Sequence, residues 1–503
     1  MSNQLPTLLD LRARPMPASA HSHRSVFKNI FSLVSGRLFV SLSRLLIYLI
    51  IIRLTNAEIF GQYVVVMSII YIGEWLMDFG FTDIAVRNIS QDTNTRSRVL
   101  HAFSSIKIVQ TLVAYCSAVG AIYLLGFTHL LPAIFIGGVA LAFFGAAQVY
   151  RVNFRLDMTM YKDMISESSG VLISIILTLI FALNGASVMA LVACHTASRI
   201  IYFLGNLYFG HGAHKFAFSF KDTTNITTLV YHSAPLGIAG IMVACYDSII
   251  PLVLSKMLSM EAVAAYSVAI RLVYPIVLVT QAINNVFYTL LSNSWASDKN
   301  RFVATQQNMV EIICVVACGF FCLVYSGSDF IISIFGESMA ESAAILRALS
   351  WGILARSMTI AMSSPIIICG GQKKTMWLTL IVVVFSTLLV IYMIPRYGIF
   401  GAVGSYLFVE IVITTIPVIF VSLYMADYRL QWLPIIKIYA SVGIAVALVS
   451  LLTTNGTLLS ALLSGLIYIA LIYLTGAVSK EKIASIISII RNRSVTATPQ
   501  PIE

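Results

Sequence analysis

The chain has 503 residues, of which 59% are hydrophobic and 11% charged, and its formal net charge is +11. Soluble domains contain about 25% charged residues, so this composition excludes a soluble globular enzyme. The basic residues are scattered through short polar segments instead of forming one solvent-facing patch, so we expect no nucleic-acid partner.

Apolar stretches of about 20 residues, the length of one membrane crossing, recur along the chain. Fourteen of them predict an all-α polytopic membrane protein. The predicted spans are residues 27–53, 60–82, 99–126, 130–155, 163–184, 186–210, 227–255, 260–290, 304–327, 341–371, 374–394, 399–425, 432–453 and 456–478.

Lysine and arginine accumulate in alternate loops, and this bias sets the orientation of membrane helices. Arg53, Lys256 and Arg396 lie on one side, and the other loop cations lie on the opposite side, together with both chain ends. The pattern predicts that both termini are cytoplasmic. Residues 1–26 and 480–503 lack a long apolar core, so we expect them to be cytoplasmic tails, the first of them disordered.

The seven cysteines all fall inside apolar stretches, so we expect no disulfides. Cys314, Cys318 and Cys322 stand four residues apart on one helical face, but no histidine or carboxylate completes a tetrahedral metal site there. We interpret them as packing residues. The sequence gives no reason to expect a metal or another cofactor.

An internal repeat predicts a protein in two lobes. Glu58 and Tyr63 recur as Glu261 and Tyr266, at an offset of 203 residues. Both copies begin a span from the same side, which predicts parallel repeats related by an axis along the membrane normal. The predicted parts are a six-helix lobe at 27–210, a cytoplasmic linker at 211–226, a second six-helix lobe at 227–425 and two appended helices at 426–479.

One face of the first span is unexpectedly polar. Arg37, Ser41, Arg44 and Tyr48 follow helical spacing and share this face. A charged side chain at mid-membrane costs about 2.5–3.5 kcal/mol on insertion scales, so such residues face protein or a water-filled cavity. With Arg271 of the eighth span they form a candidate site for phosphate oxygens, which guanidinium groups bind in bidentate fashion.

Ion pairing between helices is the alternative role for these arginines. Arg44 and Asp247 occupy equivalent repeat positions, which makes them a candidate pair. Two other cations are expected to reach water at the membrane edges, Lys107 on the cytoplasmic side and Arg347 on the other.

Four carboxylates within the spans are candidates to carry a coupling proton or sodium ion: Glu74, Asp78, Asp247 and Glu410. The alternative is structural, with Asp78 solvated at the cytoplasmic edge and Glu74 paired with an arginine. His195 and the nearby Arg199 are interpreted as a buried polar contact and not as a proton relay.

Several segments resemble the polysaccharide and oligosaccharide exporters, a family within the multidrug, oligosaccharidyl-lipid and polysaccharide exporter superfamily. Gly61–Ser90 has the Gly-x-Tyr start and the Asp-Phe-Gly-like end of the second helix in that family. Cys245–Leu272 resembles the entry of its second lobe, and Ile394–Tyr406 is the most similar segment.

The resemblance implies a flippase of the bacterial inner membrane, of the O-antigen type. Its substrate would be an undecaprenyl pyrophosphate-linked oligosaccharide, moved from the cytoplasmic to the periplasmic leaflet by alternating access through a cationic cavity between the lobes. Membrane lipid and polysaccharide assembly proteins are the expected partners. Arg37, Arg44 and Arg271 would hold the pyrophosphate, with Ser41 and Tyr48 beside them.

Two alternatives stay open. A cation-coupled multidrug antiporter of the same superfamily would favour an acidic, aromatic cavity. A membrane-embedded polysaccharide polymerase or glycosyltransferase is disfavoured, because the longest extracytoplasmic loop, around Asp329 to Glu341, has no room for a catalytic domain. We therefore predict a transporter and not an enzyme.

Overall fold

The computed structural model describes residues 23–210, 223–369, 372–424, 430–453 and 456–477. Over these residues the chain forms helices and no strands. The helices are α1 (His23–Leu54), α2 (Ala57–Asp78), α3 (Phe81–Gln91), α4 (Arg96–Leu125), α5 (Leu131–Leu156), α6 (Met160–Leu183), α7 (Val188–Phe209), α8 (Thr223–Met257), α9 (Met260–Ser297), α10 (Lys299–Ser326), α11 (Ser328–Ser333), α12 (Ser342–Leu349), α13 (Trp351–Ile368), α14 (Gln372–Tyr424), α15 (Trp432–Leu452) and α16 (Leu458–Thr475).

The number of membrane crossings is as predicted. Twelve described segments are long and apolar enough to span a bilayer. Counting α1, which has 32 residues, and both arms of α14 gives fourteen. The arms of α14 meet at Gly398, where φ is 59° and ψ is −140°, a conformation that only glycine adopts without strain. The protein is therefore an all-α, multi-pass membrane protein.

Two predicted boundaries differ from the structure. Residues 23–26 begin α1 instead of ending a disordered tail. The second span does not stop at residue 82: Phe79 and Gly80 both have positive φ, and the chain continues as the short helix α3. Hydropathy missed this break because Phe79 and Phe81, on either side of Gly80, are both apolar. The rest of the N-terminal tail, all of the C-terminal tail and most of the linker at 211–226 lie outside the described residues.

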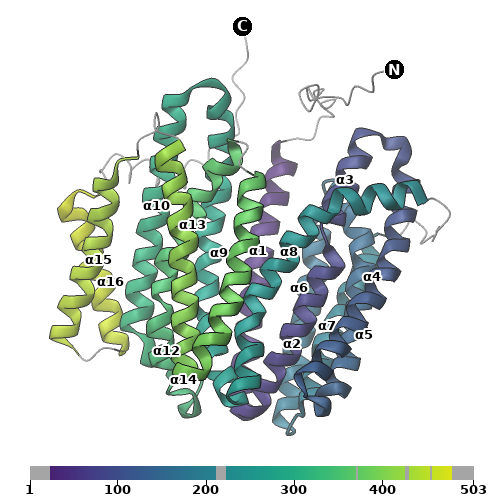
Figure 1. The fold of residues 1–503 in the computed structure, drawn as a ribbon, viewed down its shortest axis with the longest axis horizontal. Helices are drawn as coiled ribbons and strands as arrows, with labels where there is room; N and C mark the ends of the chain where they lie inside the picture. Colours follow the sequence, from purple (N-terminus) through teal and green to yellow (C-terminus); the bar gives the residue numbers. More distant parts are fainter. Residues whose placement is uncertain (1–22, 211–222, 370–371, 425–429, 454–455, 478–503) are drawn as a thin grey trace.

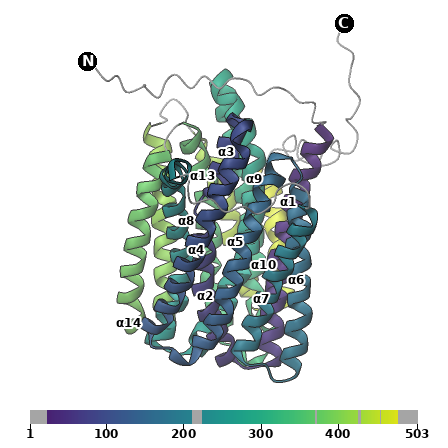
Figure 2. The same ribbon diagram turned by 90° about the vertical axis from the view of Figure 1, so that its right-hand side faces the viewer.

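The helices run roughly along one axis in both views (Figures 1 and 2). Helices α2 to α7 pack on one another, and α9, α10 and α12 to α16 form a second group. The helix α1 lies against α6 and also touches α9, and α8 packs against both groups, on α2, α3 and α4 as well as on α9 and α14. We call the end where α1 begins the terminal end and the opposite end, lower in Figure 1, the distal end. The division into two lobes at the predicted boundaries stays a prediction.

The two copies of the sequence repeat lie against each other at the distal end. Helices α2 and α9 begin at equivalent caps: the side chain of Asn56 accepts a hydrogen bond from Ile59 N, and that of Ser259 accepts one from Ala262 N. The helices then pack so closely that a Cβ added to Gly61 would collide with the backbone carbonyl of Met260. A glycine is required here because of the close approach of two backbones.

Replacing Gly61 with alanine is therefore expected to destabilise the protein by about 1–3 kcal/mol, the usual cost of overpacking. Thermal unfolding of the purified variant in detergent measures this change. Gly120→Ala is the matched control, because Gly120 is also helical but no described atom lies within 4 Å of the position that a Cβ would take there. Equal melting temperatures for the two variants would show that the α2–α9 contact is not tight.

Candidate functional site

The polar face of α1 is accessible at its arginines. Arg37 and Arg44 are exposed, Ser41 is half-buried, and Tyr48 is 7% exposed. Arg44 lies close enough to Tyr63, Tyr71 and Glu74 to interact electrostatically with each. These three neighbours belong to α2, so Arg44 faces other helices and is not directed only toward lipid.

Arg271, on α9, meets this face of α1 from the other group of helices. Its guanidinium carbon lies 4.8 Å from the centroid of the Tyr48 ring, a cation–π contact. Tyr63 and Tyr71 are also its electrostatic neighbours, as they are for Arg44. The structure thus brings Arg44, Tyr48 and Arg271 together from helices more than 200 residues apart in sequence.

The cations of this cluster form no ion pair in the part of the chain that the structure describes, although Glu74 is an electrostatic neighbour of Arg44 and Asp247 is one of Arg271. Neither Arg44 nor Arg271 forms an ion pair with a described carboxylate, and the buried Nε of Arg271 has no hydrogen-bond partner there. The alternative pairing of Arg44 with Asp247 is wrong: Asp247 accepts a hydrogen bond of 3.0 Å from Tyr274 Oη instead. Unpaired guanidinium groups with free donors are suited to an anionic ligand.

Arg37 stands apart from the Arg44–Arg271 cluster. It is seven residues from Arg44, or about 10 Å along the axis of α1 at 1.5 Å per residue. Its electrostatic neighbours include Arg151 and Glu167, charges of both signs. The structure therefore does not place Arg37 with Arg271.

Glu74 forms an ion pair with Arg199 of α7. Arg199 Nη2 and Nε lie 2.5 and 2.7 Å from Glu74 Oε1, and Arg199 Nη1 lies 3.9 Å from Glu167. His195 Nε2 is 3.5 Å from the same Glu74 oxygen, too far for a good hydrogen bond. The side chain of Arg199 is only 4% exposed, so this pair is part of the protein interior.

A second buried ion pair lies between α13 and α14. Arg356 Nη1 lies 2.7 Å from Oε1 of Glu410, whose side chain is fully buried. Tyr246 of α8 donates a hydrogen bond of 3.1 Å to the same oxygen. The other oxygen of Glu410 has no hydrogen-bond partner among the described residues.

The two remaining charges of this region behave differently. Asp78, one turn after Glu74, is half-buried and accepts a hydrogen bond from Thr82.

The prediction that Lys107 reaches water at the membrane edge is wrong. Its side chain is 4% exposed, and Nζ donates to the backbone carbonyl of Met77 and to Gln148 Oε1. Lys107 therefore caps the end of α2, where the chain breaks before α3.

Sequence reasoning missed the pair formed by Arg151 and Asp163. Arg151 Nε lies 3.2 Å from Asp163 Oδ2, and Tyr202 Oη donates to the same carboxylate at 2.7 Å. The charge pattern counts Arg151 among the cytoplasmic loop cations, and Asp163 is the first residue of a predicted span. The signal for this pair in the sequence is that helical structure continues for a further turn after Arg151 and begins about one turn before Asp163.

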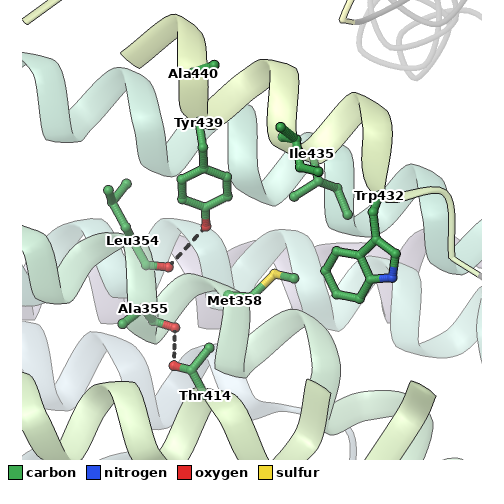
Figure 3. A pocket seen from close by; sticks show the side chains of 9 residues that line it. Leu354, Ala355, Met358, Thr414, Trp432, Ile435, Tyr439 and Ala440 are labelled. Carbon is green, nitrogen blue, oxygen red and sulfur yellow. Dashed lines mark hydrogen bonds between the residues drawn. The ribbon is translucent and has the colours of Figure 1, made fainter. Parts of the chain in front are cut away.

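An apolar hollow lies on the side of the second helix group, between α13, α14 and α15 (Figure 3). Its volume is about 620 Å³, and Met358, Trp432 and Ile435 line it. Thr414 at its edge donates to the carbonyls of Ala355 and Glu410. No arginine among the described residues lines this hollow, so it is separate from the Arg44–Arg271 cluster.

The comparisons with known proteins give the family. The model of the polysaccharide biosynthesis protein family matches residues 50–344, more than half of the chain. No curated protein matches the chain.

Solved structures give the fold. The lipid II flippase MurJ in an inward closed conformation has a TM-score of 0.72 at 14% identity, covering 92% of this chain and 99% of that chain. An inward-facing multidrug resistance MATE family transporter of the MOP superfamily has a TM-score of 0.62 at 13% identity, covering 79% and 98%. A MOP superfamily transporter from Pyrococcus furiosus, described by the reverse polarity of its binding pocket, has a TM-score of 0.56 at 13% identity, covering 79% and 96%.

At these identities the likeness shows the fold alone, which is that of the multidrug, oligosaccharidyl-lipid and polysaccharide exporter superfamily. The family match adds a place in polysaccharide biosynthesis. Together they describe a multi-pass membrane protein of polysaccharide biosynthesis. The chain belongs to the polysaccharide biosynthesis protein family.

Proposed function

We propose that the protein flips an undecaprenyl pyrophosphate-linked oligosaccharide from the cytoplasmic to the periplasmic leaflet of a bacterial inner membrane. The single observation that carries the proposal is that Arg44 and Arg271, from the two groups of helices, lie beside the same tyrosines and form no ion pair with a described carboxylate. Embedding unpaired cations in a membrane protein costs free energy, which a diphosphate ligand offsets when it binds.

In this proposal Arg44 and Arg271 bind the pyrophosphate, with the rings of Tyr48 and Tyr71 beside it. Ser41 and Arg37 lie further along α1 toward the terminal end. They would contact the substrate where it enters from the cytoplasm. Both termini are cytoplasmic in this orientation, in accordance with the positive charge of the terminal-end loops.

Coupling to a proton or sodium gradient is a further part of the proposal. Asp78 and Asp247 are its preferred carriers, since each accepts a hydrogen bond from a neutral hydroxyl group, of Thr82 and Tyr274 respectively. Glu74 and Glu410 are already neutralised by arginines, so they would carry an ion only in another conformation. Polysaccharide assembly proteins would supply the substrate and take it up after transport.

The test is a leaflet-exchange assay in liposomes that contain a fluorescent undecaprenyl pyrophosphate-linked oligosaccharide. An impermeant reductant bleaches only the lipid in the outer leaflet, so liposomes without protein keep a protected fraction. With the reconstituted protein we expect that fraction to disappear. Continued protection with correctly folded protein would refute the flippase proposal.

The same liposomes distinguish the multidrug antiporter. For that purpose they are loaded with a lipophilic cationic dye, and a proton or sodium gradient is imposed. An antiporter would move the dye, whereas a cationic site repels it. Dye transport without lipid exchange would favour the antiporter.

A further inference from the structure

Two basic side chains at the distal end connect helices across the molecule. Arg53, in the last turn of α1, donates from Nε to the carbonyl of Ile334 at 2.7 Å and from Nη2 to that of Ser333 at 3.0 Å. Lys256, in the last turn of α8, donates from Nζ to the carbonyl of Leu125 at 2.8 Å. One contact runs from α1 to the end of α11, and the other runs from α8 to the end of α4.

The two cations occupy equivalent positions of the internal repeat. Arg53 and Lys256 are separated by 203 residues, the same offset that relates Glu58 to Glu261. The acceptors are not at this offset, but they are alike in local structure, because each carbonyl lies at the end of a helix and close to a glycine with positive φ. These glycines are Gly126, with φ 81°, and Gly336, with φ 111°.

The acceptors explain why a cation is used at each position. The last carbonyls of a helix have no partner within that helix and carry part of the negative end of its dipole. A lysine or arginine therefore forms a charge-assisted hydrogen bond with them. A neutral carbonyl holds a cation less strongly than a carboxylate does, so such a contact can break and reform during a transport cycle.

We propose that Arg53 and Lys256 are a pair of latches that hold the distal end closed. Each contact joins helices of opposite predicted lobes, α1 to α11 and α8 to α4, so separating the distal ends of the lobes must break both of them. The role of the latches in transport rests on the proposed function, because they act in alternating access. They concern the opening of the distal end, however, and would stand if the transported ligand were different.

The test measures the distance between the lobes at the distal end by double electron–electron resonance in lipid nanodiscs, without substrate. Spin labels are placed at Leu183→Cys in α6 and Glu341→Cys before α12, both exposed, after the native cysteines are replaced by alanine. In the Arg53→Met/Lys256→Met double variant we expect a longer distance to appear. In each single variant we expect the population with the longer distance to be at least about tenfold smaller than in the double variant. The reason is that the remaining hydrogen bond to a charged group contributes about 1.5–3 kcal/mol.

Two sets of variants make the result specific. Arg396→Met removes another distal cation, which bonds within α14, to the carbonyl of Tyr392 at 2.9 Å. It should leave the distances unchanged. Arg53→Lys and Lys256→Arg keep a cationic donor and should keep the distal end closed. The latch proposal is wrong if the double variant shows only the short distance, or if Arg396→Met opens the distal end equally. Because no substrate is present, neither result depends on whether the protein flips a lipid.

Discussion

Replacing Arg271 or Arg44 with glutamine is expected to weaken binding of undecaprenyl pyrophosphate by at least about 30-fold, because losing one partner of a desolvated charge contact costs about 2–5 kcal/mol. The fold should survive. Neither arginine forms an ion pair among the described residues, so its removal leaves no described carboxylate unpaired. The measurement is the titration of the lipid against purified protein in nanodiscs, followed by thermal unfolding of each variant.

Two comparisons separate a binding role from a structural one. Arg396→Gln removes an exposed cation outside the site and should bind the lipid as the unaltered protein does. In cells, Arg44→Ala should insert normally into the membrane and stop assembly of the surface glycan. Normal glycan from that variant, or undiminished lipid binding by Arg271→Gln, would remove Arg44 and Arg271 from the proposed site.

Replacing Arg356 with methionine is expected to destabilise the protein by about 3–5 kcal/mol, the usual cost of breaking a buried ion pair from one side. The reason is that Glu410 is fully buried and has Arg356 as its described ion-pair partner. The hydrogen bond from Tyr246 is left to satisfy one oxygen alone. Thermal and denaturant unfolding in detergent measure the loss.

The double variant Arg356→Met/Glu410→Met makes the assignment sharper. Replacing a buried pair by apolar residues of similar volume is often close to neutral, so the double variant should recover most of the stability. If the double variant is folded but its lipid transport no longer responds to an imposed proton or sodium gradient, Glu410 carries the coupling ion in addition to pairing with Arg356. A single Arg356→Met variant as stable as the unaltered protein would show that the pair does not support the fold.

Local properties of the sequence determined the fold class and the number of crossings. Hydropathy depends on neighbouring residues, and a run of about 20 apolar residues has one stable arrangement in a bilayer, the membrane-spanning helix. The repeat of Glu58 and Tyr63 at Glu261 and Tyr266 likewise indicated two helices, α2 and α9, that the structure packs together. The short helix α3 escaped notice because its charged and polar residues resemble a loop, and because its start depends on a change of φ at Phe79.

Only the tertiary structure decided which intramembrane charges are paired. Glu74 and Arg199 are 125 residues apart, and no local pattern predicts which helix will place a guanidinium beside a given carboxylate. The spacing of the repeat indicates an ion pair between Arg44 and Asp247. In the structure, the packing of α8 and α9 places Tyr274 beside Asp247, which accepts a hydrogen bond from its hydroxyl group. The same packing places Arg44 and Arg271 beside the same tyrosines. Side-chain partners depend on the rotation and crossing of packed helices, and hydropathy does not encode either.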